Sequence, residues 1–387
     1  MKLPVICEAV EAPRLLSDSA RMSRFISTLR DLGFDLAACA KRLGSFPRLG
    51  VNFWDQMRPD WSPNPEDPID ILITLFIDGK HLPVDQLRAL TSTAFVDIAC
   101  DIGLIKLEDG ILHPKLCLFP CYGLYIVTDG SARNKALNQV MWLWGESYLL
   151  GGLASRAKRR RAIDLGTGSG VHALLASMHC DTVTAGDISP RALEFGRFNA
   201  ALNDRTNVEF VLSDLFNDVK GSADMLVTNV PYAPDTAAKA GDNFWSGGLD
   251  GFELLRRVVA ALPERLEDGG VAHINSLYPN APGISIREYF DRWLGGQVDG
   301  YEVLDHTWAV PTYSDALSDE PYEGDKSAWR FGVVSLRRAA SGPGWWRELG
   351  KRGAFFGADG ACRVVADHDQ LAPSGSSAQV EVPAYRV

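Results

Sequence analysis

Long apolar runs are absent from this chain of 387 residues. No uninterrupted stretch reaches the ~18 apolar residues of a membrane-spanning helix, so the sequence predicts no membrane segment. Residues 1–13 contain two acidic side chains and lack the basic start and apolar core of a secretory signal. The seven cysteines follow no framework spacing, and an odd number suits a reducing compartment. These absences predict a cytoplasmic protein.

Positive charge is also scarce. Lys and Arg number 39 against 49 Asp and Glu, which gives a formal net charge of -10. Proteins that bind phosphate backbones usually gather basic residues into an excess or a stripe. The one dense basic run, Arg156–Arg161, directly precedes an apolar strand and is typical of a solvated approach to a sheet. The charge therefore argues against a nucleic-acid partner and suits a neutral or cationic acceptor.

The hydrophobic pattern divides the chain into four parts. Helical spacing dominates the first part, and strands alternating with helices, as in a parallel α/β sheet, dominate the third. The predicted parts are a helical, winged-helix-like domain (15–127), a junction (128–160), a Rossmann-like domain (161–340) and a C-terminal extension and tail (341–387).

The N-terminal part has the element order of a winged helix. Three short apolar helices are predicted at 69–77, 84–90 and 94–102, followed by a hairpin of strands 104–106 and 111–118 around an Asp-Gly turn. Many winged helices bind DNA through their second and third helices, but here those helices contain Arg88 as their one cation. We therefore expect this unit to pack or to position an acceptor.

A glycine-rich turn opens the Rossmann-like part. The segment Ala162–Gly170 reads as a short buried strand, then a turn in which Thr167 lies between Gly166 and Gly168, with Gly170 before a helix. Glycines let the backbone turn sharply and approach a ligand closely, and the helix start offers unpaired N–H groups. Such a turn is where open α/β sheets bind nucleotide-like ligands.

Three acidic residues stand at predicted strand ends near this turn. Asp164 is placed to hold the amino group of a methionine-like moiety, and Asp187 to accept both hydroxyls of a ribose. Asp214 is placed to reach the exocyclic amine of adenine. Their neighbours Ile188 and Leu215 are expected to contact the same ligand, with Leu215 or Phe216 against the ring. This set predicts S-adenosylmethionine as the cofactor.

Two alternatives to that cofactor remain open. The dinucleotide pattern of an NAD site needs a glycine at position 171, where Val171 stands. A glycine turn that binds no ligand is the other alternative. Both account less well for three acids at three strand ends.

A second motif follows the fourth predicted strand, 223–228. There the chain reads Asn229-Val230-Pro231-Tyr232. The Asn229 side-chain oxygen and the Val230 carbonyl can both accept hydrogen bonds from one NH₂ group, which draws its lone pair out of conjugation and towards a methyl donor. Pro231 restricts the backbone, and Tyr232 offers a flat face to a planar acceptor. The motif predicts methylation of a planar nitrogen, with an ordinary strand-to-loop turn as the structural alternative.

With these motifs the chain resembles class I methyltransferases that carry an Asn-Pro-Pro-Tyr motif, and within them the release-factor glutamine methyltransferases. A second family segment, Gly-Gly-x-Asp-Gly, is matched by residues 247–251, and the resemblance covers about residues 120–280. It implies a Rossmann-like, seven-stranded, mostly parallel sheet. The N-terminal unit looks more like that of actinobacterial relatives with a small helical domain in front. Val230 departs from the first proline of the motif, which puts a glutamine acceptor in doubt.

The segment between two late predicted strands is a candidate for the loop that selects the acceptor. Residues 311–327 combine acidic and aromatic side chains, and Tyr313, Asp315 and Glu320 are the candidates for binding a guanidinium or amine. A solvated acidic loop is the plainer interpretation. The spacing of His113, Cys117 and Cys121 lacks a fourth ligand, so no metal site is predicted.

The sequence thus predicts an S-adenosylmethionine-dependent N-methyltransferase acting on a guanidino, amide or amine nitrogen of a small molecule or amino acid. A protein glutamine acceptor is the first alternative. A nucleic-acid base acceptor and a cofactor-binding regulator without turnover are the others. The acceptor, the number of methyl groups and the oligomeric state are left open.

Overall fold

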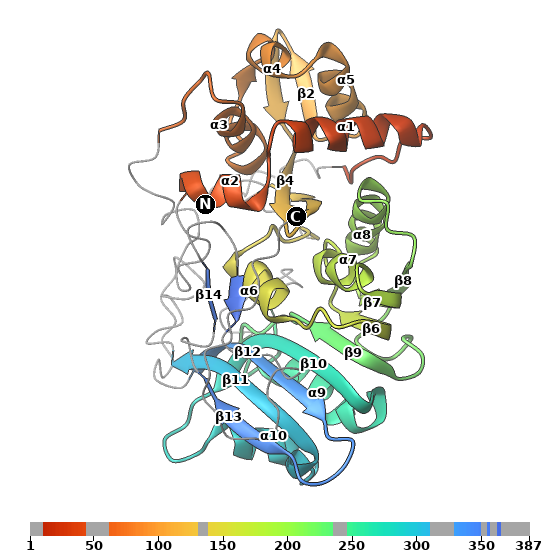
Figure 1. The fold of residues 1–387 in the computed structure, drawn as a ribbon, viewed down its shortest axis with the longest axis vertical. Coiled ribbons are helices and arrows are strands. Elements are labelled where there is room, and N and C mark those ends of the chain that lie inside the picture. Colours follow the sequence, from red (N-terminus) through yellow and green to blue (C-terminus); the bar gives the residue numbers. More distant parts are fainter. Residues whose placement is uncertain are drawn as a thin grey trace, which may run out of the picture.

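The computed structural model describes residues 11–43, 62–130, 138–234, 246–309 and 329–349, with the backbone of two further short strands, β14 (Ala354–Phe356) and β15 (Cys362–Val364). The N-terminal helical unit lies at one end of the molecule and the large sheet at the other (Figure 1). Within the described ranges, no helix is both long and apolar enough to cross a membrane.

The large sheet contains eight strands in the order β13-β11-β12-β10-β9-β6-β7-β8. The five strands from β10 to β8 are parallel, β12 pairs antiparallel with β10 and β11, and β13 adds in parallel to β11. Their bounds are β6 Arg159–Leu165, β7 Cys180–Asp187, β8 Val208–Leu212, β9 Ala223–Thr228, β10 Leu266–Pro279, β11 Tyr301–Ala309, β12 Trp329–Arg338 and β13 Trp345–Glu348. The predicted α/β class with a mostly parallel sheet is confirmed.

The predicted strand number needs a correction. The expected seven strands are present, and the eighth, β13, comes from the segment expected to be an extension beyond residue 340. Its register with β11 runs from Glu302 opposite Trp345 to Asp305 opposite Glu348. Edge pairing of this kind depends on an exposed neighbouring strand, which a local sequence pattern does not reveal.

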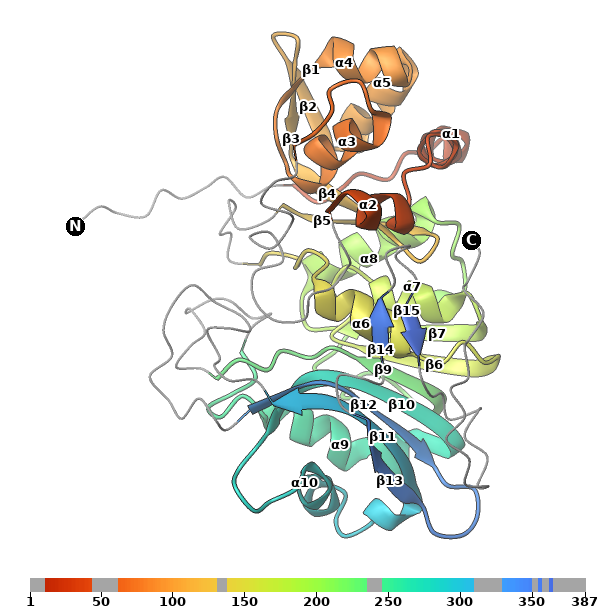
Figure 2. The same cartoon turned by 60° about the vertical axis from the view of Figure 1, so that its left-hand side comes forward.

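Helices cover both faces of the sheet (Figure 2). One face packs on α9 (Glu253–Arg265) and α10 (Ile286–Trp293), which share a core with β6, β9 and β10. The other face packs on α6 (Gly145–Leu153) and α7 (Val171–Ser177), with α8 (Pro190–Leu202) beside α7. Burial on both faces explains why the central strands read as continuous apolar runs.

The N-terminal unit contains the elements of a winged helix. In chain order these are α3 (Pro68–Leu72) with a π-helical turn (Ile73–Ile77), β1 (Leu82–Pro83), α4 (Val84–Leu90), α5 (Thr93–Asp101), β2 (Ile105–Glu108) and β3 (Ile111–Pro114), preceded by α1 (Ser19–Asp31) and α2 (Leu36–Leu43). The strands form a small sheet in the order β1-β3-β2, with the predicted two-residue turn between β2 and β3. Asp109 and Gly110 both have positive φ, as such a turn requires.

The predicted strand 111–118 is two strands. After Pro114 the N–H groups of Lys115 and Leu116 both bond the Leu104 carbonyl, which ends the β2–β3 ladder. A new hairpin follows, β4 (Leu116–Cys121) with β5 (Leu124–Asp129).

This hairpin joins the N-terminal unit to the Rossmann-like part. Asn199 on α8 accepts from the Val127 N–H (2.8 Å) and donates to its carbonyl (2.9 Å), and Asn203 does the same for Tyr125. Each side-chain amide thus makes the hydrogen bonds that a neighbouring strand would otherwise make with this edge of β5. The predicted boundary after residue 127 falls inside β5, and one core cluster runs from α1 to α8.

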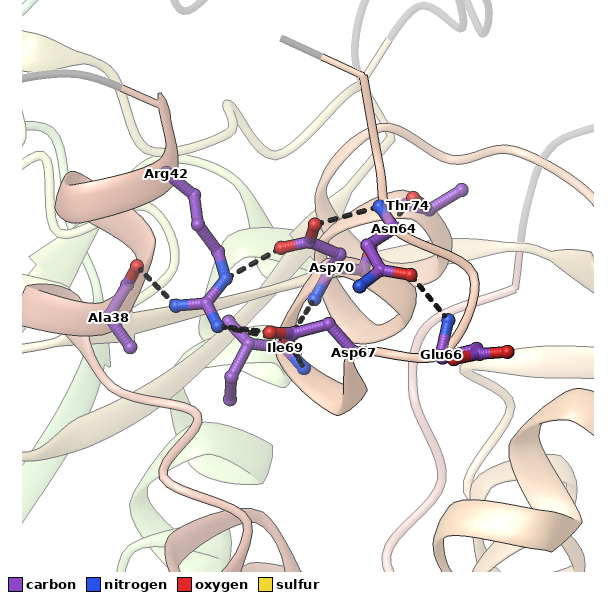
Figure 3. Close-up of polar contacts among 8 residues, drawn as sticks. All are labelled: Ala38, Arg42, Asn64, Glu66, Asp67, Ile69, Asp70 and Thr74. Carbon is purple, nitrogen blue, oxygen red and sulfur yellow. Dashed lines mark hydrogen bonds and ion pairs between the residues drawn. The ribbon is translucent and has the colours of Figure 1, made fainter.

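Figure 3 shows the polar contacts that hold α2 against the start of α3. Arg42 bonds the carboxylate of Asp67, which caps α3, and its Nε donates to Asp70 (2.6 Å). Asp70 also accepts from the Asn64 N–H (2.9 Å). This cluster ties α2 to α3, far along the chain from the glycine turn.

Candidate functional site

Strand register brings the predicted site residues together. Leu165, the last residue of β6, is the partner of both Thr228 on β9 and Gly186 on β7. The residues that follow, Gly166, Asn229 and Asp187, therefore leave the sheet side by side. In the strand order, β6 lies between β7 and β9, so this is the point where successive connections lead to opposite sides. Open α/β sheets bind ligands at such a point.

A cavity of about 460 Å³ lies at this edge. Its volume is in the range of small-molecule sites. The predicted residues that line it are Gly166, Thr167, Gly168, Asp187, Ile188, Asp214, Leu215, Asn229, Val230 and Pro231. Asp164, Gly170 and Tyr232 are not part of its wall, and Tyr313, Asp315 and Glu320 lie outside the described residues.

The glycine turn forms one wall of the cavity. Gly166 and Gly168 have positive φ (65° and 53°), so the backbone turns where side chains would be strained. The Gly168 N–H donates to the Asp187 carboxylate (2.8 Å), which links the turn to the end of β7. Gly170 has a different task from the one expected: a Cβ there would lie 3.1 Å from Gly196 Cα, so it permits α7 to approach α8.

Asp164 lies beneath the turn and is almost fully buried. Its Oδ2 accepts from the Thr167 hydroxyl (2.6 Å) and the Ala173 N–H (2.9 Å), which fixes the start of α7. Its Oδ1 has no hydrogen-bond partner among the described residues. Burial raises the pKa of Asp164 to about 7. Contact between Asp164 and a methionine amino group stays a prediction. The contacts in the structure show that this carboxyl holds the glycine turn to the start of α7.

Asp187 faces the cavity from the end of β7. Its two oxygens accept from the Gly168 and Ser189 N–H groups, both at 2.8 Å, which fixes the carboxylate at the edge of the cavity. Burial raises the pKa of this carboxyl. The next residue, Ile188, is 62% exposed and lines the cavity. A fixed carboxylate beside bare apolar surface matches a ribose with an attached ring.

Asp214 lies further along the same wall, after β8. Its Oδ2 accepts from Arg257 on α9 (2.7 Å), a contact that the sequence did not predict. Leu215 follows with a positive φ of 49°, a conformation that non-glycine residues rarely adopt and that clusters at functional sites. The predicted adenine contact must therefore share Asp214 with Arg257.

Asn229 and Val230 line the cavity on the β9 side of the glycine turn, and Asp187 lines it on the β7 side. The Asn229 Oδ1 accepts from Asn275 Nδ2 on β10 (2.8 Å), and its Nδ2 donates to Glu146 Oε1 on α6 (3.4 Å). Asn275 follows Ile274, which is the β10 partner of Thr228, so register places the two amides side by side. One lone pair of Oδ1 remains for an acceptor NH₂ group.

The expected position of Tyr232 is wrong. Its side chain is buried, its ring contacts Phe331 edge-on, and its hydroxyl donates to Glu146 Oε2 (2.5 Å). The ring is therefore not offered to an acceptor. The reason is Glu146, a buried carboxylate on a separate helix that attracts the phenol away from the cavity.

The glycine segment 247–251 packs against the backbone at the end of this motif, around Tyr232. A Cβ on Gly251 would lie 2.6 Å from the Tyr232 carbonyl oxygen, and one on Gly247 would lie 2.7 Å from Tyr232 Cα. The Gly247 N–H also donates to the Ala233 carbonyl (2.7 Å). The glycines are needed because two backbone segments touch.

Sequence reasoning missed several cavity residues. Segment 138–143 and Ser147 form a wall, although the chain around them was treated as a junction. His172 also lines the cavity, and neither ring nitrogen has a hydrogen-bond partner within the described ranges. Glu146 contacts the motif from α6. An acid alone in an apolar helix was the one signal that could have pointed to it.

Comparison with known proteins agrees with this geometry. Residues 144–250 match the family model of the methyltransferase small domain. The chain carries a class I, S-adenosylmethionine-dependent methyltransferase domain. The predicted resemblance to class I methyltransferases, the predicted cofactor class and the predicted fold are thereby confirmed.

Its relatives include glutamine methyltransferases. A putative protein N5-glutamine methyltransferase of Methanocaldococcus jannaschii is 34% identical over 122 residues, covering 30% of this chain and 61% of that protein. A release factor glutamine methyltransferase of Chlamydia trachomatis is 32% identical over 190 residues, covering 46% and 64%. A ribosomal protein uL3 glutamine methyltransferase of Bradyrhizobium diazoefficiens is 36% identical over 127 residues, covering 29% and 39%. The chain thus spans less than two thirds of the length of these relatives.

Proposed function

We propose that this protein transfers a methyl group from S-adenosylmethionine to the side-chain amide nitrogen of a glutamine in a protein. The observation that carries the proposal is the shared cavity: Asn229 and Val230 line it together with the glycine turn and Asp187. The names of the relatives favour this acceptor over the small molecule or free amino acid that the sequence suggested first.

The residues present fit the cofactor. Asp187 would accept the ribose hydroxyls, Ile188 and Leu215 would contact the adenine, and the turn at Gly166–Gly168 would pass close to the methionine. When bound, the cofactor supplies an electrophilic methyl group on a sulfonium. Each residue in this set lies at the end of a strand of the sheet or within the next three residues, so the site is formed before any ligand enters.

The chain's own residues prepare the acceptor. A glutamine amide nitrogen is a weak nucleophile because its lone pair is delocalised. The Asn229 Oδ1 and the Val230 carbonyl oxygen would each accept one of its N–H groups and so turn the lone pair towards the methyl. As the bond from the nitrogen to the methyl group forms and the bond from the methyl group to sulfur breaks, positive charge would develop on the nitrogen, and the two accepting oxygens would stabilise it. The nitrogen then loses a proton to water.

A methyl-transfer assay tests the proposal. Purified protein with radiolabelled S-adenosylmethionine is offered a release factor, ribosomal protein uL3, free glutamine and guanidino compounds in separate reactions. We expect label in a protein, placed on a glutamine by mass spectrometry, and a loss of about a hundredfold to a thousandfold in Asn229→Ala. Label on arginine or on a small guanidino compound would instead refute the glutamine acceptor. Full turnover by Asn229→Ala would refute methylation of nitrogen through this motif.

A further inference from the structure

The strongest feature without an assigned role is the buried carboxylate of Glu146. It lies on the first turn of α6, is 6% exposed, and contacts Asn229 and Tyr232, which are 83 and 86 residues away along the chain. A carboxylate this deeply buried costs stability unless its oxygens are bonded, and both of them are. Its partners belong to the same motif, which suggests a role there.

An amide side chain can face either way. The nitrogen and oxygen of Asn229 have nearly the same shape, so packing alone does not choose which one faces the cavity. Its neighbour Asn275 does not choose either, because it is also an amide and could reverse together with Asn229. A carboxylate differs, because it only accepts hydrogen bonds. Whatever lies against Glu146 must be a donor.

We propose that Glu146 is a positioning residue that fixes the direction of the Asn229 amide. By accepting from Nδ2, it leaves Oδ1 to face the acceptor side, where an acceptor NH₂ group needs an oxygen. The hydroxyl of Tyr232 holds the other carboxylate oxygen at 2.5 Å and so keeps Glu146 in place. If the Asn229 amide were reversed, its own NH₂ group would face the NH₂ group of the acceptor. This inference rests on the proposed function of Asn229.

The sharp test is Glu146→Gln, which preserves shape and adds a donor. In the variant the Tyr232 hydroxyl still has an oxygen to bond, and the new NH₂ group then faces Asn229 and favours its reversal. We expect turnover to fall by about a hundredfold while affinity for S-adenosylmethionine is unchanged. Tyr232→Phe removes one of the two contacts that hold Glu146 but leaves its contact with Asn229, so turnover should fall less than in Glu146→Gln. Glu194→Gln, the same change on an exposed face of α8, is the matched control.

A double variant separates positioning from a direct or structural role. If Glu146 acts through Asn229, then Glu146→Gln causes no further loss of turnover in an Asn229→Ala background. Independent, additive losses would overturn the inference, as would normal turnover of Glu146→Gln.

A spectroscopic test keeps the inference separate from the proposed function. In asparagine-labelled protein, the side-chain NH₂ signal of Asn229 is identified by its loss in Asn229→Ala. We expect this signal to shift as the Glu146 carboxyl titrates, with a midpoint above the usual pKa of glutamate because burial raises the pKa. The shift should vanish in Glu146→Gln. A signal that does not titrate in the wild type overturns the inference, whether or not an acceptor has been found. If the Asn229 signal titrates in the wild type but the protein methylates no nitrogen, the proposed function is refuted and the inference about Glu146 is not.

Discussion

Replacing Asn229 by aspartate would test the arrangement of this site most directly. The substitution puts a second carboxylate where the Asn229 Nδ2 now lies 3.4 Å from Glu146 Oε1. Two like charges at that separation repel by about 5 kcal/mol at an effective dielectric constant of ~20. This corresponds to a rise of about three to four units in one pKa of the pair. The two carboxyl groups should therefore share one proton at neutral pH.

The consequence is a stability that depends on pH with a known sign. The pair binds a proton in the folded state that two separate carboxylates release in the unfolded state at ~pH 4. The variant should thus be most stable, relative to wild type, at low pH, and should lose stability as the pH rises through the raised pKa. Urea unfolding at several values between pH 5 and 9 measures this difference. An isolated carboxylate at position 229 would favour cationic acceptors. Because the pair keeps one proton, the gain in activity towards such acceptors should be small.

The double variant Glu146→Gln with Asn229→Asp supplies the control. It keeps one negative charge, now at position 229, with an amide donor beside it, so the pH-dependent loss of stability should disappear. If Asn229→Asp and the double variant show the same dependence on pH, Glu146 does not lie against residue 229, and the derived repulsion is wrong.

Three further predictions follow from the same site and its surroundings. Asp187→Ala should weaken S-adenosylmethionine binding, measured by calorimetry, by about 1.5–3 kcal/mol for each charge-assisted bond lost. Asp187→Asn keeps an acceptor for the Gly168 N–H and should lose less affinity. Unchanged affinity in a folded alanine variant would remove Asp187 from the site. Burial lowers the pKa of His172 to about 3, so the folded state resists protonation, and stability should fall by about 2 kcal/mol between pH 7 and 5. His172→Gln should abolish that part of the loss. An identical acid sensitivity in the wild type and the variant would contradict this prediction. The full chain should show no tight binding to duplex DNA at low salt in a gel-shift assay, because α4 and α5 contain Arg88 as their one cation; a shift that weakens steeply with added salt would count against this prediction.

Local patterns were enough to predict several of the residues that line the cavity. The glycines at 166 and 168 stand where positive φ is required, and the acids at 187 and 214 follow short apolar strands, so turn chemistry and periodicity located them. Strands 208–212 and 223–228 were predicted with the bounds that the structure shows. The Asp-Gly hairpin turn was found for the same reason, because its backbone conformation depends on two adjacent residues.

Tertiary structure decided what each part does. Glu146 reaches Asn229 across 83 residues because α6 packs against the face of the sheet where β9 ends, and no local pattern encodes that packing. The same carboxylate turns Tyr232 away from the cavity, and contact between α7 and α8 gives Gly170 a packing task. Strand order and register are also non-local, since each depends on which distant segments bury their apolar surface together. The sequence by itself therefore determined which groups stand at the strand ends, and the packing of distant elements determined which of them face the cavity.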